Sequence, residues 1–167
     1  MEIRKANLRD IPCIMKLYEQ GRKFMREQGN KSQWEENYPS RTLIESDIAM
    51  GNSYLCLDQD SPCVVFYYRE GEDPSYAYIE DGSWLDHTPY GVVHRIASSQ
   101  SVRGAASYCL EWAFEQCGNL RIDTHKDNIP MQRLLQKNGF IHCGTIYVED
   151  HSKRMAYQKK LQTSSGG

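Results

Sequence analysis

The sequence lacks several features that would point to particular classes of protein. It has no basic surplus, because 20 lysines and arginines stand against 22 aspartates and glutamates, a formal net charge of −2. Proteins that mainly bind nucleic acid usually carry such a surplus, so we expect no nucleic-acid partner. No apolar run approaches the roughly 18 residues that span a bilayer, and residues 1–5 do not lead into the apolar region of a signal peptide. We therefore expect a cytoplasmic protein with no membrane partner.

The cysteines also lack a diagnostic pattern. The chain has six of them, and none forms a C-x-x-C pair. They lie within apolar runs, where a reduced cysteine behaves as a small hydrophobic residue. A zinc site needs clustered ligands, which this spacing does not supply. The pattern predicts reduced cysteines in the core and no metal site.

Length and hydrophobic content favour one folded unit. A chain of 167 residues is typical of one domain, and 40% hydrophobic residues can fill a core of that size. Residues 162–167 are rich in Ser and Gly, and we expect this polar tail to be disordered. We therefore predict a single domain over residues 1–161.

Hydrophobic periodicity predicts an alternation of helices and strands. Helical spacing of Ile11, Ile14 and Tyr18 predicts a long helix between Asn7 and Gly29. Further helices are predicted over 41–50, 104–117 and 129–137. Strands are predicted over 3–6, 53–57, 63–68, 76–80, 90–97, 120–124, 140–148 and 153–160. This order predicts a mixed α/β fold, with a mostly antiparallel central sheet flanked by helices on both faces.

The clearest chemical signal lies between the strand over 90–97 and the next helix. The first N–H groups of a helix have no partner within it, and the helix dipole adds partial positive charge, so a phosphate can bind there. Gly104 permits close approach because it has no Cβ, and Arg103 adds charge. The same pattern also occurs where a helix simply packs closely. The candidate anion-binding residues are Ser101, Val102, Arg103, Gly104, Ala105 and Ala106.

From Tyr90 onward the sequence resembles the GNAT acetyltransferase superfamily. That family has R/Q-x-x-G-x-G/A at a helix start, which corresponds here to residues 101–106, with Ser101 in place of the leading Arg or Gln. The family then has an Asn before a helix that ends in Gly-Phe, matched by Asn128 and by Gly139-Phe140. The resemblance implies the GNAT-like acyl-CoA N-acyltransferase fold.

The resemblance also implies acetyl-CoA as cofactor, with CoA as product. Its pantetheine arm would lie between the strands 92–97 and 120–124 and pair with the backbone of Ile96 and Ser98. A backbone N–H near Ala97 would stabilise the oxyanion of the reaction. The pyrophosphate would meet the amides of residues 102–106, and Asn128 would contact the pantetheine or the thioester end.

Acetyl transfer to an amine needs a neutral nucleophile, and an alkyl ammonium has a pKa near about 10.4. His125 and His94 are candidate bases because histidine titrates near neutral pH, and Glu80 could act through a water. In many family members a Tyr on the helix after the Asn is the acid. Leu135 stands at that position, so we expect Tyr147 to replace it. Each of these candidates could instead be a structural residue of a loop or strand.

Aromatic side chains are the candidate contacts of the acceptor. Trp34, Tyr38 and Trp84 could close a pocket over a small amine, or could pack the helices onto the sheet. We predict an acetyl-CoA-dependent N-acetyltransferase acting on a primary amine of a small molecule. Two alternatives stay open: an acetyltransferase of protein lysines or N-termini, and a sensor domain that binds acyl-CoA without catalysis. The family often forms dimers, and the sequence leaves a homodimer open.

Overall fold

The computed structural model describes residues 1–162. In this part of the chain seven strands form one sheet, in the order β1-β2-β3-β4-β5-β7-β6. Their bounds are β1 (Glu2–Lys5), β2 (Ser53–Asp58), β3 (Ser61–Glu70), β4 (Gly91–Ser98), β5 (Asn119–Thr124), β6 (Ile141–Tyr147) and β7 (Lys153–Lys160). Neighbouring strands are antiparallel except for β4 and β5, which are parallel. The predicted mixed α/β fold is confirmed. The predicted tail lies outside the described residues from 163 onward.

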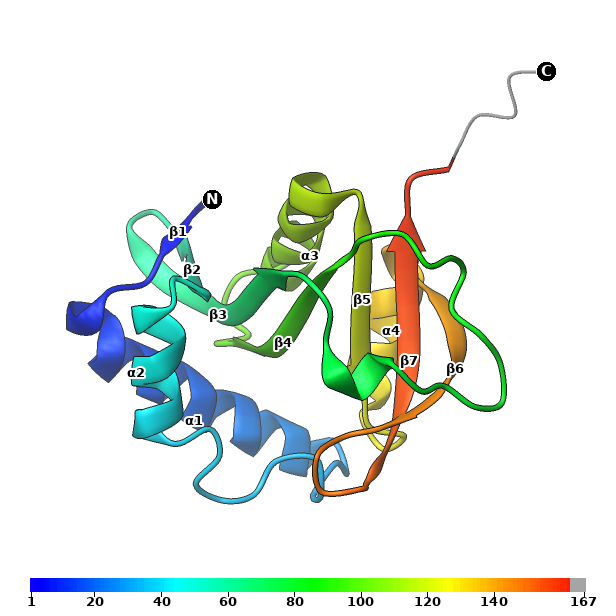
Figure 1. The fold of residues 1–167 in the computed structure, drawn as a ribbon. Helices are drawn as coiled ribbons and strands as arrows, with labels where there is room; N and C mark the ends of the chain where they lie inside the picture. The colour runs from blue at the N-terminus through cyan, green and yellow to red at the C-terminus, as the bar shows by residue number, and fades with distance from the viewer. Residues whose placement is uncertain (163–167) are drawn as a thin grey trace.

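Helices cover both faces of the sheet (Figure 1). They are α1 (Ile11–Glu27), α2 (Arg41–Ala49), α3 (Ala105–Cys117) and α4 (Ile129–Lys137). Side chains alternate between the two faces of a strand. Leu55 and Val65 therefore pack with α1 and α2, whereas their neighbours Cys56 and Val64 pack with α3 and α4. The core consequently has two main layers, one on each side of the same strands.

Short polar side chains begin the helices where the sequence predicts. The side chains of Asn7 and Asp10 form a capping box before α1, around a 3₁₀ turn over Leu8–Asp10. Ser40 accepts a hydrogen bond from the N–H of Leu43 at the start of α2. Asn128 does the same for Met131 at the start of α4. These caps satisfy N–H groups that have no partner within their helix.

The strands β4 and β5 separate soon after they meet. Their pairing covers Gly91 with Leu120 and Val92 with Arg121. Farther along β4 a bulge interrupts the pairing with β3, between the pairs Tyr67–His94 and Val65–Ala97. A bulge bends its strand, and Figure 1 shows β4 leaning away from β5. Beyond Val92 no described strand pairs with the edge of β4 that faces β5.

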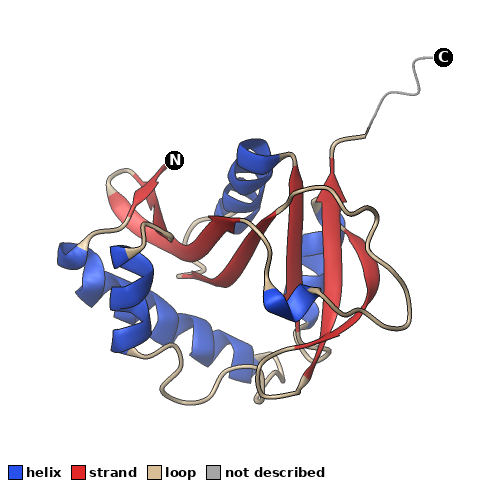
Figure 2. Cartoon of the chain, in the orientation of Figure 1, coloured by secondary structure: helices blue, strands red, loops and turns tan. Residues whose placement is uncertain are grey.

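The strand predicted over 76–80 is wrong. The chain between β3 and β4 forms a 3₁₀ turn over Pro74–Tyr76 and is otherwise irregular (Figure 2), apart from one bridge between Glu80 and Thr145. The segment does not lie between β3 and β4 in the sheet, because these two strands pair directly with each other. Tyr76 is buried against the sheet with Val92, while Tyr78 is exposed. The two tyrosines therefore do not share one face, as residues two apart in a strand would.

Candidate active site

A groove of about 540 Å³ lies where β4 runs into α3. It contains every residue that the sequence predicted to contact the cofactor: Ile96, Ala97, Ser98, Ser101, Val102, Arg103, Gly104, Ala105, Ala106 and Asn128. Lys137, at the end of α4, also lines it. Sequence reasoning missed this residue because the turn of chain that brings α4 beside α3 is a tertiary feature.

The start of α3 is open to a ligand. Gly104 has φ +80°, in the left-handed region, and a Cβ added there would meet no atom within 4 Å. No side chain caps this helix. The first N–H groups of α3 are therefore available to an anion. The expected anion site is supported by backbone geometry as well as by the charges of Arg103 and Lys137.

The edge of β4 supplies a second kind of contact. Residues 93–98 pair with β3 on one side, and on the other side β5 has diverged. An unpaired strand edge presents alternating N–H and C=O groups, which can pair with an extended amide chain. The groove thus suits a ligand with an amide-bearing arm and a phosphate group, which is the chemistry of CoA.

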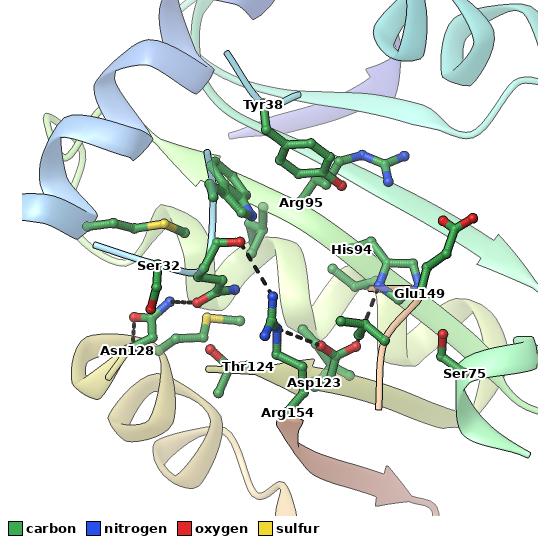
Figure 3. Close-up of a pocket in the computed structure, with 18 of the residues that line it drawn as sticks. Ser32, Tyr38, Ser75, His94, Arg95, Asp123, Thr124, Asn128, Glu149 and Arg154 are labelled. Atoms are coloured by element: carbon green, nitrogen blue, oxygen red, sulfur yellow. Dashed lines mark hydrogen bonds and ion pairs between the residues drawn. The ribbon is translucent and has the colours of Figure 1, made fainter. Parts of the chain in front are cut away.

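A second cavity, of about 570 Å³, adjoins this groove. Met25, Ile96, Asn128 and Met131 line both. Figure 3 shows the second cavity, with Asn128 and Ser32 at one side and His94, Glu149 and Ser75 at the other. The expected residues Trp34, Tyr38 and His94 line it. The two cavities meet where β4 leaves β5.

His94 is held by a carboxylate inside the second cavity. Its Nε2 lies 2.7 Å from Oδ2 of Asp73. Burial by itself raises the pKa of Asp73, but the hydrogen bond and charge of His94 outweigh it, so this pKa lies below its ordinary value. An ionised carboxylate can only accept, so Nε2 must donate. In the neutral ring, Nδ1 is then the nitrogen that can take a proton.

Asp123, on β5, faces the other ring nitrogen. Its Oδ2 lies 3.9 Å from Nδ1 of His94 and accepts a hydrogen bond of 2.7 Å from the hydroxyl of Tyr76. Its other oxygen lies 3.9 Å from Nε of Arg154. Sequence reasoning missed both Asp73 and Asp123. The available signal for Asp123 was a carboxylate next to Ile122 in the strand predicted over 120–124.

The loop between α1 and α2 is fastened to the start of α4. Oε1 of Gln33 accepts hydrogen bonds from Nδ2 of Asn30 at 2.9 Å and from Nδ2 of Asn128 at 3.1 Å. Oδ1 of Asn128 accepts from the N–H of Met131. Asn128 therefore lines both cavities while its polar atoms hold this loop against α4.

His125, the first predicted base, is placed differently from its prediction. It does not line the second cavity. Its Nδ1 accepts a hydrogen bond from the N–H of Asp127 at 3.0 Å, and its Nε2 lies 3.2 Å from Oγ of Ser32. Burial and then the charge of Arg154 lower the pKa of His125. Both ring nitrogens of His125 thus already have partners within the protein.

Glu80 and Tyr147, the other two catalytic candidates, contact each other. The hydroxyl of Tyr147 donates to Glu80, as does that of Tyr78, and neither Glu80 nor Tyr147 lines the second cavity. The hydrogen bond to Glu80 raises the pKa of Tyr147 to about 12. The two residues meet because the Glu80–Thr145 bridge joins their segments. They stabilise that contact, away from both cavities.

Trp84 is a core residue. It is 7% exposed, and its Nε1 donates to the carbonyl oxygen of Tyr76 at 2.9 Å. The guanidinium of Arg121 lies 4.1 Å from its ring centroid. Trp84 therefore packs in the core and does not line the second cavity. Trp34 also packs in the core, but it lines the second cavity together with Tyr38.

Among residues 1–162 no group of three or more His, Cys, Asp or Glu side chains is placed to hold a metal ion. No helix within the same range has the length and apolarity needed to cross a membrane.

Comparison with known proteins identifies the fold. No family model and no curated protein matches the chain. Among solved structures, a GNAT-family acetyltransferase from Streptococcus agalactiae is 32% identical, with a TM-score of 0.88 over 97% of this chain and 96% of that one. A GNAT-family acetyltransferase from Listeria monocytogenes is 20% identical, with a TM-score of 0.69 over 96% and 94%. A chain of the NatC complex bound to Gag peptide and CoA is 18% identical, with a TM-score of 0.61 over 97% and 100%. Because the Streptococcus relative matches in sequence as well as in fold over nearly the whole length, this chain belongs to the GNAT family of acetyltransferases.

Proposed function

We propose that the protein is an acetyl-CoA-dependent N-acetyltransferase that acetylates the primary amine of a small molecule. The observation that carries this proposal is the meeting of the groove and the second cavity at Met25, Ile96, Asn128 and Met131. The groove suits a phosphate-bearing donor, and the cavity presents His94 to an acceptor. A donor and an acceptor bound in these two places would meet end to end.

The residues of the groove fit acetyl-CoA. Gly104 leaves open space at the start of α3, Arg103 and Lys137 supply positive charge, and residues 93–98 offer an unpaired strand edge. A chain of the same fold was crystallised with CoA in the NatC complex, which supports this assignment. When bound, the cofactor supplies an activated acetyl thioester, so that a C–N bond forms to the acceptor, the C–S bond breaks and CoA leaves.

His94 is the proposed base. An alkyl amine arrives as an ammonium ion, since its pKa is near about 10.4, and must lose a proton before it can attack. Nδ1 of His94 can take that proton, while Asp73 holds the Nε2–H and stabilises the positive ring that results. A positioned base contributes about 10²- to 10⁴-fold to rate. We expect His94→Ala to lower kcat by about that factor.

The walls of the second cavity favour a small acceptor. Trp34 and Tyr38 come from the loop between α1 and α2, and Glu149 comes from the turn between β6 and β7. Gln33 fixes the first of these segments against α4. A pocket flanked by two such segments suits a compact amine better than a long peptide.

An acetyl-CoA turnover screen tests the proposal. Release of CoA thiol is measured with small amines, amino acids and peptides, and CoA binding is measured by calorimetry in parallel. We expect CoA to bind and small amines to be acetylated. Binding of CoA without transfer to any acceptor would support the sensor alternative instead. Faster transfer to peptides or intact proteins than to every small amine would support a protein acetyltransferase.

A further inference from the structure

The second cavity carries more negative than positive charge. Its lining includes the carboxylates of Glu35, Asp73, Asp123, Glu149 and Asp150. The guanidinium groups of Arg95 and Arg154 also line it. A cavity of this composition attracts cationic ligands and opposes anionic ones.

Both arginines are paired with other residues of the protein. Arg95 pairs with Asp47 at 2.6 Å and stacks over the ring of Tyr67, with its carbon Cζ 4.7 Å from the centroid. Its Nε is buried and has no hydrogen-bond partner among residues 1–162. Arg154 donates to Oγ of Ser152 and to the carbonyl oxygen of Lys153. Its Nε faces Asp123 at 3.9 Å. Neither arginine is thus placed to form a bidentate pair with a carboxylate of the acceptor.

Two acceptor atoms mark a place for the reacting amine, and a third polar atom of the same cavity lacks a partner. Nδ1 of His94 and Oδ2 of Asp123 are both acceptors, 3.9 Å apart. A primary ammonium has three N–H donors and can bond to both. Beside Asp123 on β5, Thr124 lines the cavity with 0% exposure, and its Oγ1 has no hydrogen-bond partner among residues 1–162. A buried hydroxyl without a partner is uncommon, so a polar ligand group is expected at this place.

Two further carboxylates of the cavity could bind a second positive charge on the acceptor. Glu149 and Asp150 belong to the turn between β6 and β7, and both are exposed at the cavity rim. In Figure 3 Glu149 lies on the His94 side of the cavity. Asp150 accepts hydrogen bonds from Ser152, which lower its pKa. A second ammonium of the acceptor could bind these carboxylates while the first faces His94.

We infer that the acceptor is a diamine or polyamine, with one amino group held between His94 and Asp123 and a second cationic group at Glu149 and Asp150. The inference rests on the proposed function and specifies its substrate class. Transfer joins the acetyl carbon to the first nitrogen and breaks the C–S bond of acetyl-CoA. The ammonium passes one proton to His94, and the second proton that the nitrogen loses ends on the departing sulfur, so that CoA leaves as the thiol. The second amino group remains protonated throughout.

Three four-carbon amines that differ at one end test the inference. The probes are 1,4-diaminobutane, butylamine and 4-aminobutanoate, which present an ammonium, a methyl group and a carboxylate at the end that does not react. We expect kcat/KM to be at least tenfold higher for the diamine than for butylamine, and lowest for the carboxylate. The preference should shrink as salt rises, because screening weakens contacts between exposed charges.

A matched pair of variants tests whether Glu149 binds the second ammonium group of the acceptor. Glu149→Gln should lower the ratio of kcat/KM for diamine over butylamine by about threefold or more. Glu115→Gln removes an exposed charge from α3, outside both cavities, and should leave the ratio unchanged. An equal fall in both variants would overturn the assignment to Glu149.

The outcomes separate the inference from the proposed function. Equal use of the three amines, or a preference for 4-aminobutanoate or for a peptide with a free N-terminus, would overturn the inference and leave acetyl transfer standing. Absence of transfer to every amine and peptide, with CoA still bound, would overturn both.

Discussion

Asp73 decides which nitrogen of His94 faces the acceptor. Its Oδ2 accepts from the ring Nε2, while its Oδ1 separately accepts from the N–H of Ser75 at 2.9 Å. The second contact fixes the carboxylate in place before any ligand binds. In the proposed reaction, Asp73 is therefore a positioning residue that acts through His94.

Asp73→Asn tests this role. The asparagine keeps an oxygen for Ser75 but offers an NH₂ group to His94, so the ring can hold its proton on Nδ1, the nitrogen that should be free. We expect kcat to fall about 10- to 100-fold, as for other losses of catalytic geometry, with the KM for acetyl-CoA unchanged. Steady-state kinetics measures both constants.

The double variant with His94→Ala provides the control. If Asp73 acts only through His94, adding Asp73→Asn to His94→Ala should cost no further activity, because the two residues work as a unit. Multiplicative losses would show instead that Asp73 affects the site by another route, such as the fold of its own segment.

At the scale of whole elements, the site depends on two local departures from regular structure. The bulge in β4 separates this strand from β5, and Arg95 within it has φ +50°, which few non-glycine residues adopt. Gly104 then turns the chain into α3 with φ +80°. The first departure opens the cleft, and the second leaves the amides of α3 exposed.

Gly104→Ala and Gly29→Ala form a matched pair that tests the second departure. Gly29, after α1, has φ +86° and also has no atom within 4 Å of an added Cβ. Each variant should lose about 1 kcal/mol of unfolding free energy from left-handed strain. Only Gly104→Ala should also weaken CoA binding, by about tenfold or 1.4 kcal/mol, because its methyl group occupies the groove. Urea unfolding measures the loss of stability, and calorimetry measures CoA binding. Equal CoA affinity in both variants would argue against an anion site at the start of α3.

At the scale of the whole molecule, several paired carboxylates tie acid stability to the fold. The hydrogen bond from Arg4 lowers the pKa of Asp10. Burial raises the pKa of Asp86, but hydrogen bonds from Thr88, Gln158 and other groups outweigh it, so this pKa is also lowered. A carboxylate with a lowered folded pKa stabilises the fold above its unfolded pKa, near about 3.9, and loses that contribution as pH falls through the folded value. Burial raises the pKa of Asp47, which acts in the opposite direction.

Asp10→Asn isolates one of these contributions. At pH 7 the variant should lose about 1 kcal/mol of unfolding free energy, since Asp10 both bonds the N–H of Asn7 and pairs with Arg4 at 2.8 Å. The difference from the unchanged protein should shrink as pH falls below the ordinary carboxyl pKa of about 3.9 and vanish below the lowered pKa of folded Asp10, where both forms carry no charge at this position. Urea unfolding between pH 2.5 and pH 7 measures it. A difference that stays constant with pH would mean that the carboxylate charge contributes nothing.

The sequence by itself determined the features that depend on neighbouring residues. The cap at Ser40, the glycine turn at Gly104 and the alternation of buried strand residues are local, so their patterns predicted the helices and most strands. The expected anion site rests on backbone amides of one continuous segment and is local in the same sense. The resemblance to the GNAT superfamily, by contrast, supplied Ile96, Ala97, Ser98 and Asn128, which line the groove.

Only the tertiary structure decided the chemistry of the second cavity. Asp73, His94 and Asp123 lie on three separate segments, and their contact depends on how the β3–β4 connection crosses the sheet. The same crossing buries Trp84 and turns the predicted strand over 76–80 into a 3₁₀ turn and irregular chain. His125 looked suitable in sequence, but backbone and side-chain partners occupy its nitrogens. The reason is physical: whether a titratable side chain is free to exchange a proton depends on partners that are distant along the chain, which no local pattern contains.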